Sequence, residues 1–170
     1  VFLYNQIVNL VRNYFVLRFL QTKCPYFCVM FELDDPFVAE KVAKMMQQNH
    51  FMHFIGFEVT RVAPGVVEGQ LVMQNHHRQQ NGFAHGGIMT TLCDTVAGFA
   101  AFTLISPNLH VVTAEIKVVY YRPATANVLY AHGRVDKSGA KLHFCESEIF
   151  GWVNNQKKVF AKATATMIVV

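Results

Sequence analysis

Charge is scarce in this chain. Only 15% of its 170 residues are charged, 52% are hydrophobic, and no dense run of lysine or arginine occurs. This composition excludes a disordered chain and a basic nucleic-acid-binding tail. The formal net charge of +4 is mild and suits an anionic small molecule better than DNA. We therefore expect one globular domain that binds a small molecule and no nucleic acid.

Cysteine is also sparse, and its spacing indicates neither a disulfide framework nor a metal site. There is no CxxC motif, and a CxxxC pair at Cys24 and Cys28 has no second ligand pair. His76 and His77 stand in a polar loop without Asp, Glu or Cys at ligand spacing, so we expect solvated loop residues. Scattered cysteines are typical of reduced thiols, which predicts a cytoplasmic protein without a metal.

The first thirty residues contain no acidic residue and are strongly apolar. Arg12 and Arg18 interrupt the run, and a charge near a bilayer centre costs about 3 kcal/mol, which disfavours a spanning helix. No small-residue cleavage site follows, so a signal peptide is also disfavoured. An added apolar helix, an interfacial anchor and residues upstream of a start at Met30 stay open. Of these, residues upstream of a start at Met30 are slightly favoured. Contact of this segment with a membrane is possible but not favoured. We divide the chain into an apolar segment of uncertain status, 1–30, and a domain, 31–170.

The rest of the chain reads as a few helices and many strands. Residues 34–50 predict a helix capped by Asp34 or Asp35, and residues 53–73 predict two strands around a Pro64-Gly65 turn. A polar loop over 74–84 leads to the longest helical pattern, 85–105. Four further strands are expected over 110–123, 127–137, 141–153 and 158–170. The order predicts an α+β fold in which an antiparallel sheet wraps around one long, mostly buried helix.

The long helix has an unusual face. Small residues and an aspartate share one side, and bulky apolar residues share the other; the first set is Gly87, Thr90, Thr91, Asp94, Ala97, Gly98 and Ala101. The helix start can bind an anion or a developing oxyanion through its unpaired N–H groups. His85 and Asp94 are nine positions apart, so a helical wheel puts them on opposite sides. Two chains around a two-fold axis could combine them, which predicts a homodimer or a dimer of dimers. A simpler interpretation also stays open: a tight entry turn at Gly86-Gly87, with Asp94 bonded to a threonine.

The stretches "HGGIMTTLCDTVAGFAA" and "VVTAEIKVVYYRPA" together resemble the hotdog-fold acyl-CoA thioesterases of the PaaI-like type, over residues 50 to 170. The resemblance implies that Asp94 acts as general base or nucleophile and that the Gly86 N–H binds the carbonyl oxygen. It also implies that Thr113 positions the water. Many members have an asparagine six residues before the histidine; here Gln79 stands there and Asn81 is nearby, so either could orient the reactants.

The resemblance implies an acyl-CoA substrate, with coenzyme A as part of the substrate and no separate cofactor. His85 and Gly87 would border the substrate, with His85 holding the loop by hydrogen bonds rather than moving protons. The CoA phosphates would pass a group of basic residues, Arg122, Arg134, Lys137 and Lys141. Two alternatives remain: a hotdog acyl-thioester dehydratase or hydratase, and a non-catalytic acyl-CoA-binding module.

Overall fold

The computed structural model describes residues 32–33 and 36–170. The apolar segment 1–30 and the capping aspartates predicted at positions 34 and 35 lie outside the described residues. The helices are α2 (Pro36–Gln47), α3 (His50–Ile55), α4 (Gly86–Thr103) and a short 3₁₀ turn, η1 (Asn75–His77). The strands are β1 (Glu32–Leu33), β2 (Phe57–Ala63), β3 (Val66–Val72), β4 (Val111–Tyr120), β5 (Val128–Ser138), β6 (Leu142–Val153) and β7 (Gln156–Val169).

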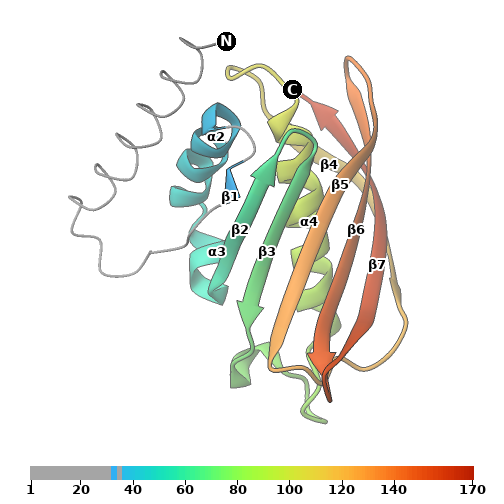
Figure 1. The fold of residues 1–170 in the computed structure, drawn as a ribbon. Coiled ribbons are helices and arrows are strands. Elements are labelled where there is room, and N and C mark those ends of the chain that lie inside the picture. Colours follow the sequence, from blue (N-terminus) through green and yellow to red (C-terminus); the bar gives the residue numbers. More distant parts are fainter. Residues whose placement is uncertain (1–31, 34–35) are drawn as a thin grey trace, which may run out of the picture.

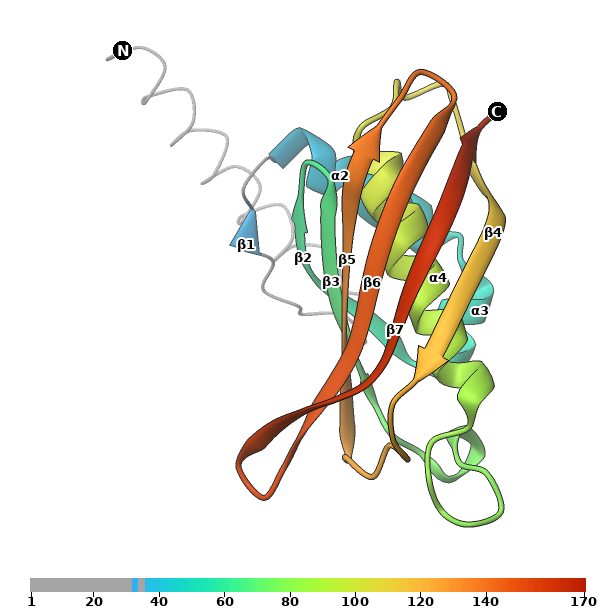
Figure 2. The ribbon, with the colours of Figure 1, turned by 90° about the vertical axis from the view of Figure 1, so that its right-hand side faces the viewer.

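One sheet contains all these strands, in the order β1-β2-β3-β5-β6-β7-β4. Every neighbouring pair is antiparallel except β1 and β2, which run parallel. The sheet curves around α4, and α2 and α3 lie on the same side of the sheet as α4 (Figures 1 and 2). The predicted α+β architecture, an antiparallel sheet wrapped around a long helix, is confirmed.

The bulky side of α4 forms the centre of the core. Met89, Leu92 and Val96 are buried against the sheet, as the helical spacing predicted. The helix passes close to β5 at Gly133, where an added Cβ would lie 2.5 Å from the Val96 backbone. A side chain at that position would push α4 away from the strand, so Gly133 is needed for this approach.

The turns between the strands follow from local backbone preferences. Gly65 has φ +74°, a conformation that glycine adopts without strain, and it closes the β2–β3 hairpin at the predicted Pro64-Gly65 turn. Asn154 and Asn155 have φ values of 51° and 59° and join β6 to β7. Two positive φ values in a two-residue loop match the right-handed twist of the strands it connects.

Two expectations about the helices were wrong. Residues 50–55, half of which were assigned to a strand, form the separate helix α3, because the Asn49 side chain caps it and Gly56 ends it with φ +74°. Ala97 and Ala101, placed on the open small-residue side of α4, are fully buried against β6 and β7. The open strip of α4 is therefore narrower than predicted.

Candidate active site

The start of α4 is held by His85, the N-cap residue. Its Nδ1 accepts a hydrogen bond from the Gly87 N–H at 2.9 Å, and its own backbone N–H donates to the His77 carbonyl at 2.8 Å. His85 thus holds the loop and the helix start together, as expected. The Gly87 N–H is already occupied. The Gly86 N–H has no hydrogen-bond acceptor among the described residues, so it remains available to a ligand.

The carbonyl of Gly86 is also bonded. The Tyr120 hydroxyl donates to it at 3.1 Å and the Thr90 hydroxyl at 3.2 Å, and these two hydroxyls lie in hydrogen-bond contact with each other. Tyr120 is the last residue of β4 and was missed by sequence reasoning. No sequence signal links it to a glycine 34 positions away, because their contact depends on how β4 is placed beside α4.

Asp94 lies in the middle of α4 and is partly exposed. The Thr113 hydroxyl, near the start of β4, donates to Asp94 Oδ1 at 2.7 Å. Asp94 Oδ2 has no hydrogen-bond partner among the described residues. The structure therefore brings together two of the residues that the family resemblance indicated, and leaves one carboxylate oxygen open.

Gly86 and Asp94 both contact β4, but at opposite ends of that strand. Eight residues of helix separate them, a rise of about 12 Å. His85 is the extended N-cap residue, so the helical wheel does not describe its direction relative to Asp94. The two groups are instead separated along the helix axis. Both descriptions lead to the same consequence: one chain does not bring them to a common point.

Gln79 and Asn81 belong to the loop that precedes α4. This loop is closed by backbone bonds from Gln79 to Phe83 and from Gly82 to Gln79, and the Gln79 side chain bonds to the Asn81 N–H. Gln79 is partly buried and lines a hollow of about 340 Å³ beside Gly86, whereas Asn81 is exposed and does not line it. The placement favours Gln79 as the residue that meets a substrate.

The same hollow contains Tyr120 and Arg122, and Phe83 and Met89 supply apolar walls. Arg122 and Gly86 therefore line one hollow, and a guanidinium and a free N–H both favour an anionic or carbonyl-bearing ligand. The β5–β6 hairpin, which carries Lys137 and Lys141, lies at the other end of the sheet in this chain (Figure 1). Of the basic residues expected near coenzyme A, only Arg122 is beside the start of α4.

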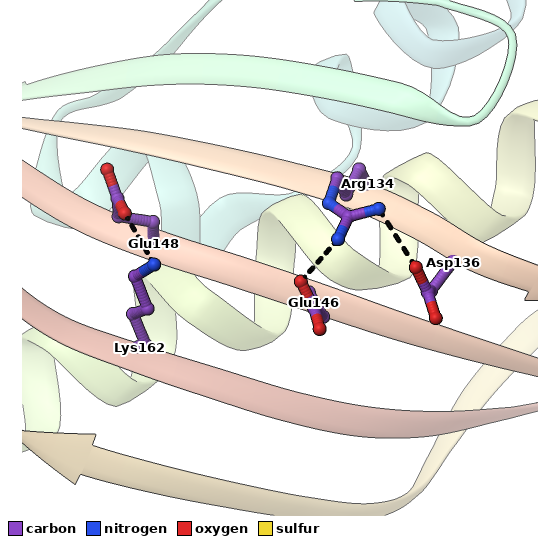
Figure 3. Close-up of polar contacts among 5 residues, drawn as sticks. All are labelled: Arg134, Asp136, Glu146, Glu148 and Lys162. Carbon is purple, nitrogen blue, oxygen red and sulfur yellow. Dashed lines mark hydrogen bonds and ion pairs between the residues drawn. The ribbon is translucent and has the colours of Figure 1, made fainter.

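A larger hollow, of about 610 Å³, lies on the sheet face opposite α4. Several of its charges are already paired: Arg134 bonds to Glu146 and Asp136, and Lys162 bonds to Glu148 (Figure 3). These neighbours raise the pKa of Arg134, chiefly through its hydrogen bond to Glu146. The Arg134 guanidinium is thus already bonded to acidic side chains in this chain. The site at the helix start, with its open N–H, is the better candidate despite its smaller volume.

The cysteines and histidines do not form a metal centre within the described residues. Cys93 and Cys145 are free and buried, and burial raises the pKa of each thiol to about 11, so neither is a ready nucleophile. The prediction that both loop histidines are solvated was wrong for His77. It is buried, and its Nδ1 accepts from the Gln74 N–H at 2.9 Å, which builds the turn η1.

The comparisons with known proteins agree with this geometry. The family described as the thioesterase superfamily matches residues 81–151, which span the helix start, Asp94 and Thr113. Over these residues the chain is similar to the thioesterase superfamily. The resemblance to hotdog thioesterases inferred from the two motifs is thereby confirmed.

A thioesterase family protein from Silicibacter pomeroyi is 28% identical, with a TM-score of 0.76 over 78% of this chain and 98% of that one. The E. coli PaaI protein from the phenylacetic acid degradation operon has a TM-score of 0.70 at 19% identity, covering 78% and 93%, and supports the hotdog fold alone. The proofreading thioesterase EntH of Klebsiella pneumoniae is 24% identical over 46% of this chain and 58% of its own length. These similarities support a hydrolase with thioester hydrolysis as its general chemistry. None of the helices in the described part of the chain has the length and apolar character needed to cross a membrane.

Proposed function

We propose that this protein is a thioesterase that hydrolyses acyl-CoA to the free acid and coenzyme A. The observation that carries the proposal is the pairing of Asp94 Oδ1 with the Thr113 hydroxyl, which leaves Oδ2 open to a water or to the thioester. A carboxylate oriented in this way can take the proton of a water molecule, or attack the thioester carbon directly. In the first route the hydroxide displaces coenzyme A, and the leaving thiolate takes up the proton held by Asp94. In the second route an anhydride of Asp94 and the acyl group forms as the thiolate leaves, and a water then hydrolyses this anhydride to the free acid.

The second part of the proposed chemistry is stabilisation of the oxyanion. When water or Asp94 attacks the thioester carbon, negative charge develops on the carbonyl oxygen. The Gly86 N–H, unpaired and at the positive end of α4, supports the role of donor to that oxygen. Gln79 lines the same hollow and would orient the reactants, and Arg122 would meet the phosphates of coenzyme A. No bound cofactor or metal takes part in this scheme.

A complete site would need two chains. Oxyanion donors and base must both lie within about 3 Å of the reacting atoms, whereas Gly86 and Asp94 are about 12 Å apart along one helix. Strand β4 is an uncovered edge of the sheet with exposed apolar residues, which supports a second copy as its partner. Each site would then combine the α4 start of one chain with Asp94 and Thr113 of the other. We therefore propose a homodimer, and a dimer of dimers would also contain this shared site.

The experiment is a thiol-release assay over a panel of acyl-CoAs with chains of increasing length. Asp94→Asn should lower kcat about a hundredfold or more, as loss of a general base does, while the near-isosteric amide keeps the fold. Asp136→Asn, on the sheet face opposite α4, is the matched control and should keep full activity. If the wild-type protein hydrates or dehydrates the acyl group and releases no thiol, the dehydratase or hydratase alternative would be favoured. Binding of acyl-CoA without turnover would favour the binding module.

A further inference from the structure

We infer that Tyr120 is a positioning residue for the oxyanion donor, an inference that rests on the proposed thioesterase function. Tyr120 ends the edge strand β4, and its ring lies against the start of α4: an added Cβ on Gly86 would be 3.5 Å from the ring. Its hydroxyl reaches the Gly86 carbonyl and the Thr90 hydroxyl. Nothing in the general scheme of base and oxyanion hole requires a tyrosine at this place.

The reason for such a residue lies in the two glycines. Gly86 and Gly87 form the first turn of α4, where glycine leaves the backbone its greatest conformational freedom. An oxyanion donor stabilises the transition state because it is already oriented when the reaction begins. A backbone N–H that moves among several orientations therefore stabilises the oxyanion much less. The glycines admit a substrate to the backbone, but by themselves they do not hold the donor still.

Hydrogen bonds to both the N–H and the carbonyl of one peptide group restrain this glycine turn. The peptide between Gly86 and Gly87 has its N–H bonded to His85 Nδ1 at 2.9 Å. Its carbonyl accepts from Tyr120 at 3.1 Å and from Thr90 at 3.2 Å. With both the N–H and the carbonyl of this peptide bonded, Gly86 has little freedom left to change its backbone angles and so to turn its own N–H. Tyr120 therefore acts through Gly86 and does not itself need to touch the thioester.

This arrangement also links the donor to β4, the strand that carries Thr113. Tyr120 and Thr113 lie at opposite ends of β4, seven residues apart, and each bonds to α4. Pairing with β7 holds this strand along its length. The strand thus positions both parts of the proposed chemistry relative to α4, one hydroxyl at Asp94 and one at the Gly86 carbonyl.

The test is the steady-state kinetics of Tyr120→Phe on the best acyl-CoA substrate. Loss of an oxyanion donor lowers kcat about 10²–10³-fold, and a donor that is present but poorly held should cost less, about tenfold. KM and the thermal midpoint should stay near the wild-type values, a split that a purely structural role would not produce. Tyr130→Phe removes the same hydroxyl from the opposite face of the sheet and should change none of these quantities.

A pair of Thr90 variants keeps the inference testable if Tyr120→Phe does not fold. Thr90→Ser keeps a hydroxyl beside the Gly86 carbonyl and should retain activity, whereas Thr90→Val should lower kcat. In the double variant the losses should not multiply, because both hydroxyls restrain one carbonyl. Wild-type kcat in Tyr120→Phe, or equal activity in Thr90→Ser and Thr90→Val, would overturn the role of this hydroxyl pair while leaving the proposed hydrolysis intact. A wild-type chain that releases no thiol from any acyl-CoA would overturn the proposed function and this role of Tyr120 together.

Discussion

At the scale of single residues, His143 on β6 is a buried titratable group outside the proposed site. It is 2% exposed, and neither ring nitrogen has a hydrogen-bond partner among the described residues. It pairs across the sheet with Met167 on β7, which is also fully buried. Burial without a partner favours the neutral imidazole and lowers the pKa of His143.

This shift predicts a pH-dependent stability. The unfolded chain takes up a proton near the ordinary histidine pKa of about 6.5, but folded His143 resists protonation. The free energy of unfolding should therefore fall as pH drops below about 6.5, by up to about 1.4 kcal/mol per pH unit for one proton. His143→Leu should lose less stability between pH 7.5 and pH 5 than the wild type, measured by thermal unfolding at each pH. The exposed His53→Gln serves as control, and equal losses in wild type and His143→Leu would contradict the argument.

At the scale of elements, α2 secures the far end of α4. Lys41 on α2 donates to the carbonyls of Phe102 and Ile105 at 2.6 and 2.7 Å, and its ammonium lies 4.0 Å from the centre of the Phe102 ring. A cation at a helix C-terminus bonds carbonyls that have no partner within the helix and complements the helix dipole. The Lys41 side chain thus joins α2 to residues that are 61 and 64 positions further along the chain.

Lys41→Met should lower the free energy of unfolding by about 1.5–3 kcal/mol, because hydrogen bonds made by a charged group are lost and two carbonyls lose a donor. Lys44→Met removes a similar charge from the exposed side of the same helix and should have little effect. Chemical denaturation of both variants measures the difference. Equal stability of the two would show that the Lys41 contacts contribute nothing.

Long periodic elements were predictable, and short ones were not. The pattern over 85–105 predicted α4 within two residues, because an apolar face repeated over five turns has few alternatives. Residues 50–55 were misread because a six-residue helix carries little periodicity, and "HFIGFEV" resembles the start of a strand. The flanking Asn49 and Gly56 were the available signals for α3. In the site, Asp94, Gly86 and Thr113 could be identified from motifs, but Tyr120 could not.

At the scale of the whole molecule, β4 is the feature that the single chain leaves unexplained. It is an edge strand of ten residues with few side chains even partly buried, and Val112 and Val119 are 48% and 45% exposed. A long apolar edge is a hazard for aggregation unless something covers it. A second copy that pairs along this edge would cover it and would bring a second α4 with its Asp94 to the first chain. The proposed dimer therefore accounts for the exposed strand and for the incomplete site together.

The shared site can be tested by mixing two inactive variants, Asp94→Ala and Gly86→Val. In Gly86→Val the added side chain meets the Tyr120 ring and should block the helix start. Neither homodimer has an intact site, but a heterodimer has one intact site and one doubly damaged site. Random pairing should give about half heterodimers, and so about a quarter of wild-type thiol release, if the sites act independently. Circular dichroism must show that both variants fold, and differential tags must show that the chains exchange. Under those conditions, a mixture as inactive as its components would rule out a site that combines Gly86 of one chain with Asp94 of the other.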